Sequence, residues 1–114
     1  MPDCLFCQIA NKEIPAEVVY EGDEVLAFED IDPQAPVHIL IIPKEHIPTI
    51  QDEKAGSGNL LASLYEAVQK IASDKGLDDQ GYRVVVNHGE QGGQSVAHLH
   101  FHLLGGRNLT WPPG

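Results

Sequence analysis

The stretch His98-Leu99-His100-Phe101-His102 places three of the chain's six histidines at every second position. Side chains alternate between the two faces of a β-strand, so a strand over 97–103 would turn the three imidazoles to one side and the apolar residues to the other. Such a row could be a solvated polar face, a metal site, or a set of acid–base and nucleophilic groups. The last interpretation is favoured, because imidazole occurs in both protonation states near neutral pH and no carboxylate lies on the strand.

A glycine-rich loop, residues 89–95, comes directly before the histidines. Its glycines allow another molecule to approach the backbone closely, and consecutive N–H groups can hold an anion. Ser95 adds a hydroxyl beside the imidazoles. Alone, such a loop would be an ordinary strand connection, but next to three histidines it indicates an anion site.

The rest of the chain predicts a single α+β domain over residues 1–114. Apolar residues three and four apart over 59–75 predict one long helix with Gly76 at its C-terminal cap. The run 37–43 is almost continuously apolar, which is typical of a strand buried on both faces. Strands and helices do not alternate in repeated units, so a mainly antiparallel five-stranded sheet is expected. The other predicted elements are a short helix at 4–10 and strands at 17–21, 25–29, 82–87 and 97–103, with 44–59 as a loop.

Charge and hydropathy exclude several classes of partner. The 17 acidic and 7 basic side chains give a formal net charge of -10, which argues against binding to a nucleic-acid polymer. A few N–H groups and imidazoles can still hold one phosphate, so a mononucleotide remains possible. No apolar run approaches the roughly 18 residues that span a bilayer, and the start has no secretion signal, so we expect a cytoplasmic protein without membrane partners.

Taken together, these motifs resemble the histidine-triad (HIT) superfamily. The resemblance runs along nearly the whole chain and includes Glu13-Ile14-Pro15, the segment from Asp30 to His38, Gly92-Gly93-Gln94-Ser95-Val96 and the triad. Gly105-Gly106-Arg107 and the ending Trp111-Pro112-Pro113-Gly114 resemble its Hint branch, typically purine nucleoside phosphoramidases. The resemblance implies a HIT-like sheet with one long and one short N-terminal helix. It also implies a homodimer that joins two sheets through the 59–75 helix and the strand after it, with Trp111 near the neighbouring subunit's site.

The resemblance also implies roles for the histidines. His100 would attack the α-phosphorus and form a nucleotidyl-histidine intermediate that water then resolves, which is chemistry suited to a neutral imidazole. His102 and Ser95 would contact the phosphate and help the leaving group to depart. His38 and His98 would orient or tune the row.

The same resemblance implies a nucleotide site. Apolar residues would enclose the base, Asp30 would hold the ribose hydroxyls, and Asn87 would lie on the phosphate or leaving-group side. Core packing, for each apolar residue, and turn formation, for Asp30 and Asn87, are competing explanations. The implied set is Phe6, Ile9, Phe28, Asp30, Ile31, Asn87, Gly93, Gln94, Ser95, Val96, His100 and His102.

The substrate expectation follows from the charges around the triad. No lysine or arginine lies in the triad or in the glycine loop, so nothing there clamps a β- or γ-phosphate. This favours a purine nucleoside phosphoramidate such as AMP-lysine. A dinucleoside polyphosphate hydrolase or nucleotidyl transferase is the alternative, and a nucleotide-binding regulatory module is an alternative of another class.

The two cysteines, Cys4 and Cys7, are too few for a disulfide framework. By the resemblance, a Cys-x-x-Cys pair belongs to members that carry zinc, and His46 and His98 would complete a structural Cys2His2 site. Catalysis itself would need no cofactor. Small buried hydrophobic residues are the competing interpretation of the two cysteines.

Overall fold

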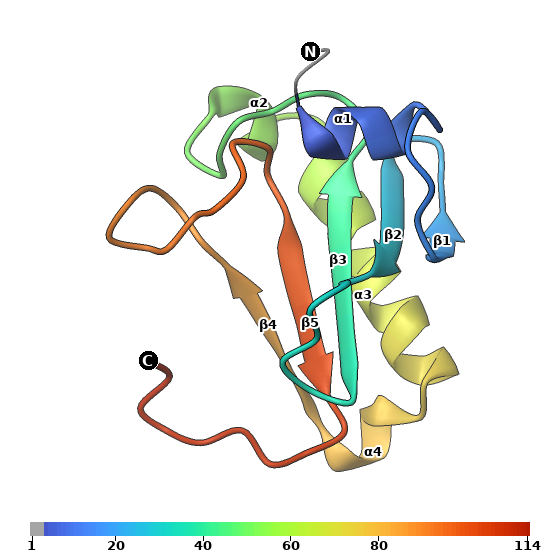
Figure 1. Cartoon of the computed structure of the whole chain (residues 1–114), viewed down its shortest axis with the longest axis vertical. Helices are drawn as coiled ribbons and strands as arrows, with labels where there is room; N and C mark the ends of the chain where they lie inside the picture. The colour runs from blue at the N-terminus through green and yellow to red at the C-terminus, as the bar shows by residue number, and fades with distance from the viewer. Residues whose placement is uncertain (1–3) are drawn as a thin grey trace.

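The structure, a computed structural model, describes residues 4–114. A five-stranded antiparallel sheet forms its centre (Figure 1). The strand order is β1-β2-β3-β5-β4, and each neighbouring pair is antiparallel. The α+β prediction is therefore confirmed. The strands are Val18–Glu21 (β1), Val25–Glu29 (β2), Val37–Pro43 (β3), Tyr82–Val86 (β4) and Phe101–Gly105 (β5), and the helices are Leu5–Ala10 (α1), Glu53–Gly56 (α2), Leu60–Asp74 (α3) and Leu77–Gln80 (α4).

Two apolar layers lie on opposite faces of β2 and β3. The long helix α3 covers one face, where Leu64 and Val68 are fully buried. The short helix α1 covers the other face, where Phe6 packs against Phe28. Because both faces are covered, β3 is buried from its second residue to its last, as its near-continuous apolar sequence predicts.

The helices differ from the prediction mainly in the short elements. Helix α3 lies within the predicted 59–75, and Gly76 directly follows its cap with φ 72° in the left-handed region that favours glycine. Helix α2 lies in the segment 44–59 that was predicted as a loop, and α4 follows Gly76. Each of these two helices has only four residues, which is too short to show a hydrophobic period.

The prediction of a histidine strand over 97–103 was wrong at both ends. Strand β5 begins at Phe101 and runs to Gly105, so only His102 of the triad lies in the regular strand. The chain before it pairs elsewhere, because the N–H of Leu99 donates to the Ile47 carbonyl at 2.7 Å, in the segment after β3. The alternation of faces persists nevertheless: Leu99 joins the layer under α3, whereas the His98 ring contacts Phe6 of α1.

After β5 the C-terminal residues leave the sheet as a tail without helix or strand (Figure 1). Arg83 of β4 holds this tail by donating to the carbonyls of Leu109 and Thr110. Trp111 in the tail is 80% exposed. Within residues 4–114, none of the helices is long and apolar enough to cross a membrane.

Candidate active site

A cavity of about 590 Å³ opens beside the histidines, between α1, the end of β2 and the segment before β5. Most of its wall is apolar, and His100, His102 and Ser95 contribute polar groups. The sequence-predicted residues that line it are Phe6, Ile9, Phe28, Asp30, Ile31, Ser95, Val96, His100 and His102. The structure thus brings together nine of the twelve residues implied for the nucleotide.

Other residues of the lining were not anticipated: Leu5, Ile14, Pro15, Ala16, Glu17, Glu29 and Leu40. The alternation along β3 could have identified Leu40, because it faces the α1 layer together with Ile42. Residues 14–17 are irregular, so no period marks which of their side chains face the cavity.

Gly93 and Gln94 of the glycine-rich loop, and Asn87 just before that loop, do not line the cavity. The Asn87 amide donates to the Gly92 carbonyl at 2.7 Å, and the Gln94 side chain donates to the Pro48 carbonyl at 2.8 Å and accepts from the Gly89 N–H. A Cβ on Gly92 would clash with the backbone carbonyl oxygen of His88, so this turn requires glycine. Asn87 and Gln94 therefore shape the loop that presents Ser95, and their contact with a nucleotide stays a prediction.

His100 lies in the cavity wall with its ring orientation fixed. The ring is 4% exposed and makes an edge contact with Phe6, with 5.0 Å between ring centroids. Its Nδ1 lies 2.8 Å from the His98 carbonyl oxygen, which can only accept, so Nδ1 carries the proton. In the neutral ring Nε2 then holds a free electron pair. This is the tautomer that a nucleophilic imidazole needs.

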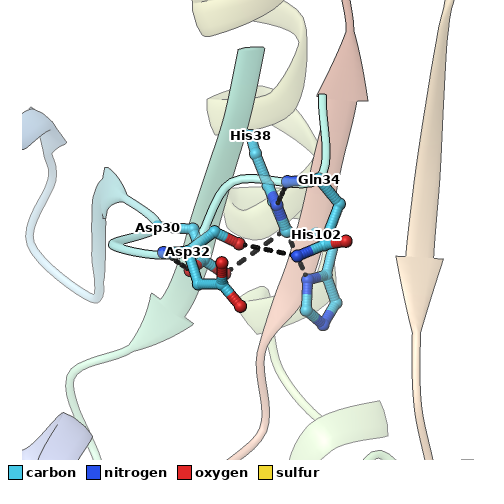
Figure 2. Close-up of polar contacts among 5 residues, drawn as sticks. All are labelled: Asp30, Asp32, Gln34, His38 and His102. Carbon is cyan, nitrogen blue, oxygen red and sulfur yellow. Dashed lines mark hydrogen bonds and ion pairs between the residues drawn. The ribbon is translucent and has the colours of Figure 1, made fainter. Parts of the chain in front are cut away.

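His102 and His38 share a hydrogen bond, drawn in Figure 2 with their neighbours. The backbone N–H of Gln34 donates to His38 Nδ1 at 3.0 Å, so neutral His38 carries its proton on Nε2. That nitrogen lies 2.9 Å from His102 Nδ1 and 3.4 Å from a carboxylate oxygen of Asp30. His102 Nδ1 is therefore the acceptor, and neutral His102 carries its proton on Nε2.

Burial lowers the pKa of His102 to about 4, with smaller contributions from His100 and His38 that exceed the opposite effect of Asp30. His102 is therefore neutral at neutral pH, as the hydrogen bond from His38 requires. The same cause, burial, lowers the pKa of His98. Both imidazole rings are therefore neutral in the folded protein at neutral pH.

The pKa of His102 predicts a pH effect on stability. Between its ordinary value of 6.5 and about 4, the unfolded chain takes up a proton on His102 that the folded chain does not. The free energy of unfolding should therefore fall as the pH is lowered through this window. Urea unfolding at several pH values should show a shallower fall in the variant His102→Gln, and equal slopes in wild type and variant would contradict the assignment.

Four candidate metal ligands converge beside α1. The Cys7 Sγ lies 3.2 Å from His46 Nδ1 and 3.5 Å from His98 Nδ1, and the Cys4 Sγ lies 3.4 Å from His98 Nδ1. Ligand bonds of about 2.3 Å to sulfur and 2.0 Å to nitrogen place the corners of a zinc tetrahedron roughly 3.5 Å apart, so the spacing fits. His98 Nε2 lies 2.8 Å from the Pro43 carbonyl and must donate to it, which leaves the Nδ1 electron pair facing the sulfurs. The donor set therefore suits zinc.

A second group, Asp30, His38 and His102, also has its ligand atoms close together. It suits a metal poorly, because the Gln34 N–H keeps the proton of neutral His38 on Nε2, the atom that would face the ion. This cluster is a hydrogen-bond network.

Comparisons with known proteins agree with the fold and identify the family. The chain matches the HIT domain family over residues 11–109. An uncharacterized HIT-like protein of Synechococcus elongatus is 54% identical over 112 residues, which cover 98% of this chain and 97% of that protein. The crystal structure of a HIT family hydrolase from Legionella pneumophila superposes with a TM-score of 0.94 at 55% identity and covers 98% of this chain and 100% of that one. A histidine triad nucleotide-binding protein of Candida albicans gives a TM-score of 0.82 at 32% identity, over 96% of this chain and 83% of that one.

Proposed function

Because this chain belongs to the HIT domain family, we propose that it is a hydrolase that cleaves the P–N bond of purine nucleoside phosphoramidates. The observation that carries the proposal is the tautomer of His100, a cavity residue whose Nε2 electron pair is free while its Nδ1–H is held by a backbone carbonyl. A nitrogen of this kind can attack phosphorus without first losing a proton.

In the first step the His100 Nε2 electron pair forms a bond to the α-phosphorus, and the P–N bond of the substrate breaks. The departing nitrogen takes the bonding electron pair and one proton, which reaches it from solvent through the Ser95 hydroxyl, a group that donates and accepts at once. His102 Nε2–H donates to a phosphate oxygen and stabilises the charge that develops there. Water then attacks the nucleotidyl-histidine, loses a proton to solvent, and returns the electron pair to His100.

The nucleoside would occupy the apolar part of the cavity. Phe6 and Phe28, which pack edge to face with 5.6 Å between ring centroids, contribute apolar surface to the wall against which a base can lie. One Asp30 oxygen accepts from the N–H of Asp32 at 2.8 Å, which fixes the carboxylate. Its remaining lone pairs can accept from the two ribose hydroxyls.

The charges around the cavity favour a substrate with one phosphorus. Its lining within the described residues contains no lysine or arginine, whereas it includes the acidic residues Glu17, Glu29 and Asp30. A chain of three or four phosphates would meet no cationic clamp there. We infer that polyphosphates are poor substrates.

The test compares two substrates on one enzyme. Adenosine phosphoramidate should be turned over with a kcat/KM at least 100-fold above that of diadenosine tetraphosphate, which corresponds to about 2.7 kcal/mol. Release of the free amine and of AMP should be equimolar. A preference for the tetraphosphate would replace the proposal with a dinucleoside polyphosphate hydrolase.

We also propose that the four ligands Cys4, Cys7, His46 and His98 hold a structural zinc ion. Bound there, zinc would tie α1 to the segment before β5 and leave the reaction to the residues of the cavity. No coordination position needs to be open to substrate, since a Cys2His2 set fills a tetrahedral site.

The protein is further proposed to form a homodimer through β4. Tyr82, Val84 and Val86 alternate along this edge strand, so they share one face, and they are 37 to 40% exposed. Sedimentation should give a dimer at micromolar concentration and a monomer for Val84→Lys. The matched control is Val18→Lys on the opposite edge strand β1, where the valine is 43% exposed and the dimer should persist. A monomeric wild type would count against the interface.

A further inference from the structure

The residue that sets the tautomers of His38 and His102 is itself held on three sides. Gln34 donates its backbone N–H to His38 Nδ1, and its side-chain amide donates to the Asp32 carbonyl at 3.0 Å (Figure 2). Its own carbonyl accepts two bonds from Arg107, from Nε at 3.2 Å and from Nη2 at 3.0 Å. Arg107 therefore fixes the backbone of Gln34 from a position 73 residues further along the chain.

The backbone of the segment after β5 allows the contact between Arg107 and Gln34. Gly106 adopts φ +92°, and a Cβ at this position would lie 2.8 Å from Pro36, so glycine lets the segment come close to the loop between β2 and β3. Arg107 also donates to the Asn108 carbonyl at 3.1 Å, which sets the direction of its guanidinium. The planar guanidinium is suited to holding carbonyl groups on more than one side.

We propose that Arg107 is a positioning residue for the reaction, acting through the Gln34 backbone to hold the protons of His38 and His102 on Nε2. The chain of contacts runs from the guanidinium to the Gln34 carbonyl, from the Gln34 N–H to His38 Nδ1, and from His38 Nε2–H to His102 Nδ1. His102 then offers a donor to the cavity. This inference rests on the proposed function, since the donor matters only if a phosphate binds there.

Without Arg107, the Gln34 N–H can turn away from His38. His38 could then carry its proton on Nδ1, and His102 would follow by taking its own proton on Nδ1 as the donor to His38 Nε2. The His102 electron pair would then face the cavity and repel a phosphate oxygen. The groups that face His102 in this network are His38, His100 and Asp30, and Arg107 contacts none of them in the structure's hydrogen bonds.

Two measurements test the inference in the full-length protein. Imidazole ¹H–¹⁵N correlation spectra at pH 7.5 without substrate report which nitrogen is protonated. Arg107→Ala should show a sizeable Nδ1–H population at His38 and His102, and wild type only Nε2–H. With the phosphoramidate, kcat should fall by about 3- to 10-fold with KM changed less, as expected for loss of one partly exposed charged hydrogen-bond donor.

Three further variants sharpen the test. Arg107→Lys keeps a donor for the Gln34 carbonyl and should retain the wild-type tautomers. Arg107→Met keeps the apolar stem without a donor, and it stands in for the alanine variant if that fails to fold. The matched control is Arg83→Ala, because Arg83 also binds backbone carbonyls of the C-terminal segment but has no link to Gln34, so the tautomers should not change.

Wild-type tautomers in Arg107→Ala or Arg107→Met overturn the inference whatever the activity. Altered tautomers with kcat within twofold of wild type also overturn it. The spectra need no substrate, so they decide the hydrogen-bond chain even if the wild type fails to cleave the phosphoramidate. That failure would overturn the proposed function alone.

Discussion

Replacing His100 with alanine should lower turnover of a nucleoside phosphoramidate by about 10⁴-fold or more, as loss of the nucleophile does in other enzymes with covalent intermediates. The structure leaves no substitute at this position: His98 Nε2 donates to Pro43, and His102 carries its proton on the nitrogen that is free of His38. Nucleotide binding should persist, because the apolar wall and Asp30 are untouched. Single-turnover kinetics and binding of AMP measured by calorimetry separate the two effects.

The covalent intermediate gives a second, direct readout. Wild-type enzyme quenched with denaturant at alkaline pH, where the P–N bond of a nucleotidyl-histidine survives, should carry a nucleotidyl group on the peptide that contains His100, and the alanine variant should carry none. His88→Ala is the matched control, since His88 is exposed and belongs neither to the cavity nor to the metal ligands, and its turnover should stay within twofold. A His100→Ala enzyme that retains turnover within tenfold of wild type would require a different nucleophile.

The alternation of residues 98–102 could be predicted from the sequence because it depends only on the local period of an extended chain. The residue at which β5 begins could not be predicted from the sequence. It depends on the bond from the Leu99 N–H to the Ile47 carbonyl, which joins segments about fifty residues apart and draws the chain away from β3. The pattern of apolar residues along the strand is the same whether or not that bond forms.

The tautomers are the part of the site that no sequence pattern contains. They depend on which backbone atom faces each ring: the His98 carbonyl for His100, the Pro43 carbonyl for His98 and the Gln34 N–H for His38. Gly105-Gly106-Arg107 contributed to the resemblance, but its contact with Gln34 becomes visible only once β3 and β5 lie side by side. Composition and spacing identified the histidines, and the folded backbone assigns their protons.

Removal of zinc should have the second large effect, on stability. The untagged protein should be purified with one zinc per chain, and Cys7→Ala should retain less than a tenth of that. Helix α1 has six residues and cannot be stable alone, so we expect it to depend on the proposed zinc site and on the packing of Phe6 and Ile9. Loss of the metal should lower the free energy of unfolding by roughly 3 kcal/mol or more and the Tm by about 10 °C.

Loss of zinc should also weaken nucleotide binding, because the proposed zinc ligands and the cavity residues lie on the same segments of the chain. Leu5, Phe6 and Ile9 of α1 line the cavity, and His98, whose ring is a proposed ligand, offers its carbonyl to His100 Nδ1. Affinity for AMP should therefore fall together with zinc content when the protein is treated with a chelator, and it should recover when zinc is returned. This titration uses the wild-type sequence, so it does not depend on how a variant folds.

The variant Cys4→Ala can distinguish a zinc site from two cysteines that only pack as small apolar side chains. Cys7 is buried, and Cys4 is only half-buried. If the cysteines merely fill space, Cys4→Ala should cost well under the roughly 1 kcal/mol expected of Cys7→Ala. If both hold zinc, each single substitution breaks the same tetrahedral site, so the two variants should lose zinc and Tm to the same extent, and the double variant should add little. Unequal losses, with wild-type protein free of zinc, would leave Cys7 as a core residue of α1 and Cys4 as the N-cap of that helix.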